Sequence, residues 1–303
     1  MTKQLPLKYV LLYMLVLATF TTLDIQAQNK QSQIPPITLE NVSYGPHKNQ
    51  IFDFWKAHEK GLAPLVIYIH GGGFKGGSHD KLWGNYVKRF LDAGVHHISI
   101  EYRFLRHAPF PAQHLDVQRA LQFIRSKADE WGIDKKRIAA YGGSAGGQLV
   151  TYLAWHEDIA NPQSDDPIAR ESSRLTAVAA KGVQSTMDLN WWVKNIPGYT
   201  KSFHKEDLKA NETKYMSKLT NNLSVINHIS SDDPPTLLVY KSNPSDPVPN
   251  SNVKTWSTHH VNFGIALEKK LKAKDVEVHL CYPNKKTAFN DDIPKFLVYH
   301  LKK

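Results

Sequence analysis

The pentapeptide GGSAG, residues 142–146, places Ser144 in a G-x-S-x-G pattern. The stretch Arg137 to Tyr141 before it predicts a short strand, and the residues from Gln148 onward predict a helix. A sharp turn from a strand into a helix strains the central serine and projects its hydroxyl out of the sheet. Small neighbours are needed there because the backbones pass close together. This context favours a nucleophilic Ser144 over an incidental serine in a glycine-rich turn.

A second glycine-rich motif, HGGGF at residues 70–74, directly follows the apolar stretch Leu65 to Ile69, which predicts a buried central strand. A tetrahedral oxyanion needs backbone N–H groups aimed at it, and glycines let the backbone come close. The two motifs together predict an oxyanion hole formed by the N–H groups of Gly72, Gly73 and Ala145. His70 is interpreted as a structural anchor of this loop.

Strand-like and helix-like stretches alternate along the chain, which predicts an α/β fold over residues 28–303 with a mostly parallel central sheet and helices on both faces. In the predicted helix Ala112 to Trp131, Leu115, Ala120, Leu121 and Ile124 have helical spacing. The other expected strands are 51–55, 95–100, 177–183, 236–240 and 276–282, and the other expected helices are 83–91 and 263–272.

Residues 188–233 interrupt this alternation, because they are polar, contain helical stretches and lie between two predicted strands. They are interpreted as a short helical cap-like insertion. Trp191 and Trp192 in this segment are candidates for substrate binding, since an indole ring can stack on a sugar or an aromatic acyl group. Packing within the core or the cap explains the pair equally well.

The chain resembles the α/β-hydrolases of the hormone-sensitive-lipase and bacterial feruloyl/acetyl esterase (BD-FAE-like) group. The matching stretches are 44–46, 70–74, 101–103, 110–112 with Asp116, and 141–148. This resemblance covers roughly residues 42–154 with good specificity and then thins. It implies an α/β-hydrolase fold and serine carboxylesterase chemistry on small acyl or aryl esters, with no cofactor. It also implies, from many exported relatives, the removal of acyl groups from polysaccharides.

A serine esterase needs a histidine to take the hydroxyl proton and an acid to orient that histidine. In this fold the acid and then the histidine follow the serine along the chain. Asp246 lies in the expected place for the acid, after the predicted strand 236–240. The alternative is a turn aspartate beside Pro247, which is a common arrangement.

The histidine is absent from its usual place, since Thr287 occupies that position after the last predicted strand and His300 is too remote. One hypothesis is a relocated base, with His259 or His260 serving Ser144 from a loop that reaches the carboxyl edge of the sheet. The rival hypothesis is that this pair packs structurally or binds a ligand, and that catalysis is impaired or lost.

The N-terminus predicts export. Lys3 and Lys8 precede the apolar run Val10 to Phe20, and Ala27 offers a small residue for cleavage. We interpret residues 1–27 as a secretory signal peptide, with an uncleaved membrane anchor as the alternative. The expected localisation is secreted or periplasmic, without stable membrane insertion after cleavage. The single cysteine, Cys281, excludes an intrachain disulfide and is expected to be buried.

The formal net charge of +10 comes from scattered lysines and arginines, without a basic stripe interleaved with aromatics, so no nucleic-acid partner is expected. His96 and His97 lack partners at metal-ligand spacing, so no metal is inferred. The sequence thus predicts an exported serine carboxylesterase for small-molecule or polysaccharide esters. The alternatives are an impaired hydrolase that acts as a binding protein, and a peptidase or lactonase. The ester and the oligomeric state stay open.

Overall fold

A computed structural model describes residues 34–204 and 214–303, so the predicted signal peptide over residues 1–27 lies outside the described residues. The core is an eight-stranded sheet in the order β1-β2-β4-β3-β5-β6-β7-β8. The strands are β1 (Leu39–Ser43), β2 (Ile51–Trp55), β3 (Ala63–Ile69), β4 (His96–Ile100), β5 (Ile133–Gly143), β6 (Ala177–Lys181), β7 (Thr236–Val239) and β8 (Val278–Cys281). No helix in the described part of the chain is long and apolar enough to span a bilayer.

The sheet is mostly parallel, as predicted. Strands β3 to β8 pair in parallel, whereas β2 pairs antiparallel with both β1 and β4. The carboxyl ends of the parallel strands therefore meet at one edge, where α/β folds form their binding sites.

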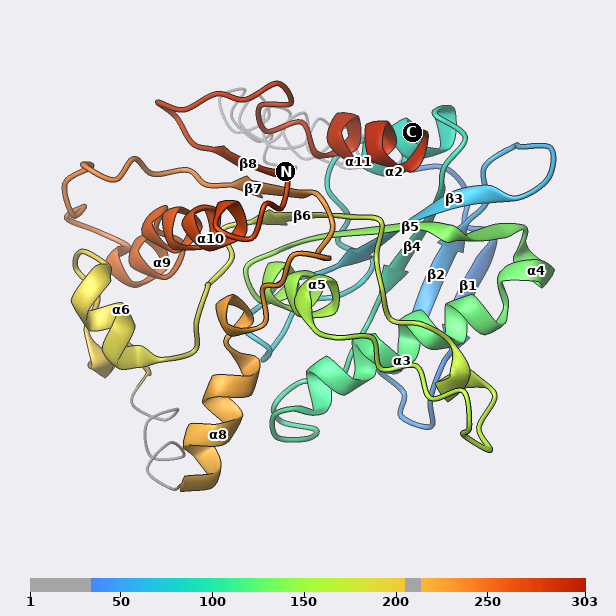
Figure 1. The fold of residues 1–303 in the computed structure, drawn as a ribbon, viewed down its shortest axis with the longest axis horizontal. Helices are drawn as coiled ribbons and strands as arrows, with labels where there is room; N and C mark the ends of the chain where they lie inside the picture. Colours follow the sequence, from blue (N-terminus) through green and yellow to red (C-terminus); the bar gives the residue numbers. More distant parts are fainter. Residues whose placement is uncertain (1–33, 205–213) are drawn as a thin grey trace, which may run out of the picture.

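Helices cover both faces of the sheet (Figure 1). The helices on one face are α3 (Ala112–Ser126), α5 (Ala145–Trp155) and α10 (Asn262–Lys272), and those on the other are α2 (Tyr86–Asp92) and α11 (Ile293–Leu301). Strand β3 shows why both faces are apolar. Its alternate residues Leu65, Ile67 and Ile69 pack on the first face, while Val66 and Tyr68 pack on the second.

The helix predicted over Ala112 to Trp131 is broken, because α3 ends at Ser126 and the short helix α4 (Ala128–Trp131) follows. Of the four apolar residues noted for their helical spacing, Leu115 does not face the core, since its side chain is 51% exposed. His114 and Val117 are fully buried instead. They lie three residues apart on the same side of the helix, and Leu115 is rotated away from that side.

Other expected boundaries differ at their ends. The helix expected from Trp83 begins at Tyr86, and the Trp83 ring before it packs on Tyr68 and Tyr141 of the sheet. Strand β5 is longer than expected, and β6, β7 and β8 are each shorter.

Between β6 and β7, where the sequence predicts a cap-like insertion over residues 188–233, the chain forms α6 (Leu189–Asn195), η2 (Lys201–His204), α8 (Lys214–Leu223) and η3 (Val225–Asn227). Helix α6 packs on α10 through the stacked rings of Trp191 and Phe263, whose centroids are 5.5 Å apart. Helix α6 thus lies against the first face near the carboxyl edge of the sheet (Figure 1).

Candidate active site

Ser144 lies at the tip of a strained turn between β5 and α5. Its φ of 54° and ψ of −123° are rare for a residue with a side chain, and such strain is concentrated at active sites. The Ser144 N–H donates to the carbonyl of Lys181, 2.9 Å away, which fixes the turn against the end of β6. The half-buried side chain stands at the amino end of α5, where the helix dipole favours negative charge.

His259 is brought to Ser144 from a distant segment. It follows the short helix α9 (Val253–Thr258), and its Nε2 lies 2.8 Å from Ser144 Oγ. Its other ring nitrogen, Nδ1, lies 2.7 Å from the carbonyl oxygen of Thr255. A carbonyl can only accept, so a neutral imidazole here carries its proton on Nδ1. The Nε2 lone pair is then free to accept the Ser144 hydroxyl proton.

The surroundings of His259 keep its ring neutral at pH 7. Burial lowers the pKa of His259, and the hydrogen bond to the Thr255 carbonyl offsets this only in part. A neutral imidazole in hydrogen-bond contact with a hydroxyl is the arrangement of a general base.

Two residues that sequence reasoning missed hold His259 in place. The Gln184 side chain donates to the Thr258 carbonyl at 2.5 Å and to the Gly182 carbonyl at 3.1 Å, so it ties the end of α9 to the chain after β6. Gly182 has a φ of +59°, and a Cβ added there would lie 3.2 Å from Cδ2 of His259. The only sequence signal for this role is a glycine near the end of the predicted strand 177–183.

Gly182→Ala is expected to lower kcat about tenfold, because its methyl group displaces the His259 ring by a few tenths of an ångström and a misplaced catalytic group is costly. The control is Gly84→Ala, since Gly84 has a similar φ of +51° but no neighbour within 4 Å of an added Cβ. Both variants carry the backbone strain, of roughly 1 kcal/mol. Equal kcat values for the two variants would contradict a packing role for Gly182.

The HGGGF loop lies directly beside the serine turn. A Cβ added at Gly71 would be 2.6 Å from the Gly143 carbonyl oxygen and 3.4 Å from Ser144 Cβ. Gly72 has a φ of +116°, and its carbonyl accepts from the N–H groups of Lys75 and Gly76, which closes a tight turn. Within the described ranges, the N–H groups of Gly72 and Gly73 have no hydrogen-bond partner in the protein. Ala145 begins α5 next to Ser144.

Asp246 is not brought to His259. Its carboxylate accepts from the backbone N–H of Asn243 at 2.6 Å and from the Asn243 side chain at 3.1 Å, and these bonds lower its pKa. Because the Thr255 carbonyl occupies Nδ1 of His259, this geometry does not fit the predicted role of Asp246 as the orienting acid and instead matches the alternative of a turn aspartate.

Thr287 stands in the usual place of the histidine, and its hydrogen bonds within the described residues are local. Its hydroxyl accepts from the N–H of Phe289 at 3.3 Å, and its carbonyl from the N–H of Asn290. These contacts shape the loop after β8.

His260 points away from the serine. It is fully buried, packs edge-on against Trp256, and accepts from the N–H of Asn262 through Nδ1. Its Nε2 is buried without a hydrogen-bond partner in the described part of the protein. Of the two histidines, the structure therefore places only His259 beside Ser144.

The two tryptophans differ in what they can reach. Trp192 is buried and donates to the Thr186 carbonyl at 2.7 Å, so its ring belongs to the core and has no face open to a ligand. Trp191 is half-buried and lines a cavity of about 950 Å³ together with residues of α6, α8, η3 and α10. Neither Ser144 nor His259 lines this cavity, so the cavity is separate from the proposed catalytic pair.

The remaining candidates have structural partners. His97 Nε2 contacts the Tyr141 hydroxyl at 3.0 Å, and His96 Nδ1 accepts from the N–H of Ala57. Cys281 is buried, as expected. Across residues 34–204 and 214–303, no group of three or more histidine, cysteine or acidic side chains is arranged to hold a metal ion.

The fold is similar to that of solved esterases. A truncated form of a carbohydrate esterase from gut microbiota matches with a TM-score of 0.68 and 18% identity, over 89% of this chain and 98% of that one. An acetyl ester-xyloside bifunctional hydrolase from Caldicellulosiruptor lactoaceticus matches with a TM-score of 0.62 and 21% identity, over 85% and 89%. At such identities the likeness shows the fold alone, which is the α/β-hydrolase fold.

Sequence relatives cover shorter stretches. Esterase LipC of Mycobacterium tuberculosis is 29% identical over 158 residues, which are 52% of this chain and 38% of LipC. The probable carboxylic ester hydrolase LipM of the same organism is 26% identical over 212 residues, 68% of this chain and 48% of LipM. The chain thus matches less than half the length of either relative. The BD-FAE family model, however, matches residues 53–256, more than half of the chain. The chain therefore belongs to the BD-FAE family of α/β-hydrolases.

Proposed function

We propose that the protein is a serine carboxylesterase in which Ser144 is the nucleophile and His259 the general base. The observation that carries this proposal is the 2.8 Å contact between Ser144 Oγ and His259 Nε2 at the strained turn after β5. A nucleophile in contact with a base, which is itself oriented by a third group, is the signature of nucleophilic catalysis. Membership of the BD-FAE family and the similarity to esterases support the same chemistry.

In the first half-reaction, Ser144 Oγ attacks the ester carbonyl carbon as its proton passes to His259 Nε2. The carbonyl π electrons move onto oxygen, and the N–H groups of Gly72, Gly73 and Ala145 donate to this oxyanion. The tetrahedral intermediate then collapses. The bond to the leaving oxygen breaks, and the alcohol departs with the proton from His259. The product is an acyl ester of Ser144.

In the second half-reaction, water replaces the alcohol. His259 takes a proton from the water as its oxygen attacks the acyl carbon, and it returns that proton to Ser144 Oγ when the intermediate collapses. The acid is released and the enzyme is restored. The Thr255 carbonyl accepts from Nδ1–H throughout, which keeps Nε2 directed at the reacting atoms. These steps require no cofactor.

The proposed substrates are small acyl or aryl esters, including acyl groups carried by polysaccharides. Support for the second class comes from the carbohydrate esterase and the acetyl ester-xyloside hydrolase that share the fold. The predicted signal peptide over residues 1–27 adds the proposal that the enzyme acts in the periplasm or outside the cell, where such polymers occur.

The alternative of an impaired hydrolase rested on Thr287 in place of the usual histidine. The contact between His259 and Ser144 weakens that alternative, because an imidazole from another loop lies within hydrogen-bond distance of the serine hydroxyl. A peptidase or lactonase would use the same groups, since the fold does not set the substrate. No observation on the described residues favours either of them over an esterase.

The test is to treat the mature protein, residues 28–303, with p-nitrophenyl acetate and butyrate and with a fluorescent organophosphonate. We expect turnover of the esters, and a single covalent label that mass spectrometry of the peptides assigns to Ser144. Labelling of Ser144 without ester turnover would indicate a reactive serine with another substrate. Absence of both would refute the proposal.

A further inference from the structure

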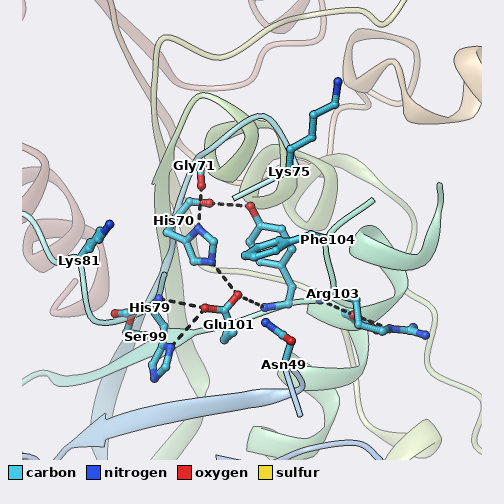
Figure 2. A network of polar contacts seen from close by, with 12 residues as sticks. Asn49, His70, Gly71, Lys75, His79, Lys81, Ser99, Glu101, Arg103 and Phe104 are labelled. Atoms are coloured by element: carbon cyan, nitrogen blue, oxygen red, sulfur yellow. Dashed lines mark hydrogen bonds and ion pairs between the residues drawn. The ribbon is translucent and has the colours of Figure 1, made fainter. Parts of the chain in front are cut away.

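A buried ionic cluster of Glu101, His70 and His79 lies at the base of the HGGGF loop (Figure 2). At its centre is Glu101, which directly follows β4, while His70 directly follows the adjacent parallel strand β3. Glu101 and His70 are both nearly excluded from solvent, with 5% and 2% exposure. The mechanism above uses neither side chain. Buried carboxylates need partners, so each contact of Glu101 identifies what the cluster holds together.

The two oxygens of Glu101 bind the two ends of one loop. Oε1 lies 3.1 Å from Nε2 of His70, the residue before Gly71. Oε2 accepts from the backbone N–H of His79 at 3.3 Å and lies 3.4 Å from Nδ1 of the same residue. Figure 2 shows Glu101 between the two histidines. The segment 71–78, which carries Gly72 and Gly73, is therefore closed at its base by a single carboxylate.

His79 is itself held on two further sides. Its Nε2 lies 3.3 Å from Oδ2 of Asp53 on β2, and its carbonyl accepts from the Ser99 hydroxyl on β4 at 2.5 Å. The loop between the histidines folds back on His70, because a Cβ added at Gly77 would lie 2.3 Å from Nδ1 of His70. The loop is thus short, folded on itself and anchored to three strands.

The cluster carries charge inside the protein. Burial acts to lower the pKa of His79, but Asp53 and Glu101 outweigh it and raise the pKa to about 9. Burial acts to raise the pKa of Glu101, but hydrogen bonds from His70 and His79 lower it to about 2. At pH 7 a cationic His79 thus lies between two carboxylates, and charge-assisted hydrogen bonds of this kind are stronger than neutral ones.

We propose that His79 is a positioning residue, which through Glu101 and His70 holds the N–H groups of Gly72 and Gly73 at the geometry that an oxyanion requires. This inference rests on the proposed function, since it assigns His79 a part in the same reaction. Donors of an oxyanion hole must be aligned before the charge develops. A loop fixed at both ends by one carboxylate meets this requirement without any contact between His79 and the substrate.

The test compares His79→Gln with wild type in two measurements. The first is kcat per active site, with active sites counted by organophosphonate titration so that unfolded protein is left out. We expect a fall of about 10- to 100-fold with KM within about threefold, because only the transition state uses the oxyanion donors. The second is hydrogen–deuterium exchange of residues 71–78, which we expect to become faster and which does not depend on activity.

The control is His96→Gln, since His96 is buried at the opposite end of β4 and bonds to Ala57 and Gly132 rather than to the loop. It should change neither measurement. Unchanged kcat per site in His79→Gln would overturn the proposal, whatever the melting temperature. Unchanged exchange would overturn it as well. If wild type neither hydrolyses an ester nor takes up the organophosphonate label, the proposed function fails, and exchange alone decides whether His79 fixes the loop.

The pH profile offers a further readout that a purely structural role would not change. The titratable groups facing His79 are Asp53 on β2 and Glu101 after β4, with His70 behind Glu101. Wild-type kcat should fall as the pH rises through about 9, where His79 loses its proton. In His79→Gln this fall should be missing, and its persistence would contradict the role.

Discussion

Ser144→Ala is expected to lower kcat by about 10⁴- to 10⁶-fold on any ester that the wild-type protein hydrolyses, which is the usual effect of removing a catalytic nucleophile. The physical reason is that no other hydroxyl or thiol is in contact with His259 in the described part of the chain. Without Oγ, the imidazole can only activate a water directly, and the covalent route through an acyl serine is lost. The measurement is the initial rate of p-nitrophenyl acetate hydrolysis, corrected for the spontaneous reaction.

The fold of this variant should be intact. Alanine keeps the Cβ, so the positive φ of residue 144 is neither relieved nor made worse, and the N–H bond to the Lys181 carbonyl remains. We therefore expect a melting temperature within about 2 °C of wild type, together with complete loss of organophosphonate labelling. Residual activity of more than about 1% of wild type would mean that Ser144 is not the nucleophile.

The sequence predicted the two glycine-rich turns of the site, because the geometry of each turn is determined by its own residues and by the strand before it. The GGSAG turn and the HGGGF loop each follow a buried strand, and adjacent parallel strands bring both motifs to one edge of the sheet. Gly71 lies near Ser144 because the strands before them pair in parallel. The alternation of strands and helices in the sequence already predicts this parallel pairing. The mostly parallel sheet was predictable for the same reason.

The rest of the site depends on contacts that residue types do not encode. His259 and His260 are adjacent, and the end of α9 alone decides which ring meets Ser144 and which enters the core against Trp256. The partner of Nδ1 in His259 is the Thr255 backbone carbonyl, which no search for a carboxylate could find. Asp246 is a case in which the position along the chain is misleading. It follows the predicted strand where the acid is expected, but its carboxylate is bound by Asn243.

A carbonyl in place of the carboxylate changes the energetics of the site. It fixes the tautomer of His259 as well as an acid would, because a carbonyl also accepts from Nδ1–H. It supplies only a partial negative charge to the imidazolium that forms during reaction, so this cation is stabilised less than beside a carboxylate. We infer that the base works through position and tautomer, and that Gln184 and Gly182 are needed because no ion pair within the described residues holds the ring.

The adjacent histidines allow a matched comparison of two substitutions. His259→Asn is expected to lower kcat by at least about 10³-fold, because an amide at this position cannot take the proton of Ser144. His260→Asn should keep kcat per titrated active site within about threefold, since an amide oxygen can replace Nδ1 as acceptor for the Asn262 N–H. Its cost should appear as a lower melting temperature instead, because His260 is fully buried.

The pH dependence of kcat/KM in wild type should report the same imidazole. Because burial lowers the pKa of His259, activity should persist below the ordinary histidine pKa of about 6.5 and fall only when the ring takes up a proton at lower pH. In His260→Asn this acidic fall should be unchanged, whereas in His259→Asn any remaining activity should lack it. Equal losses of kcat in the two variants, or an acidic fall that follows His260, would show that the imidazole beside Ser144 is not the base.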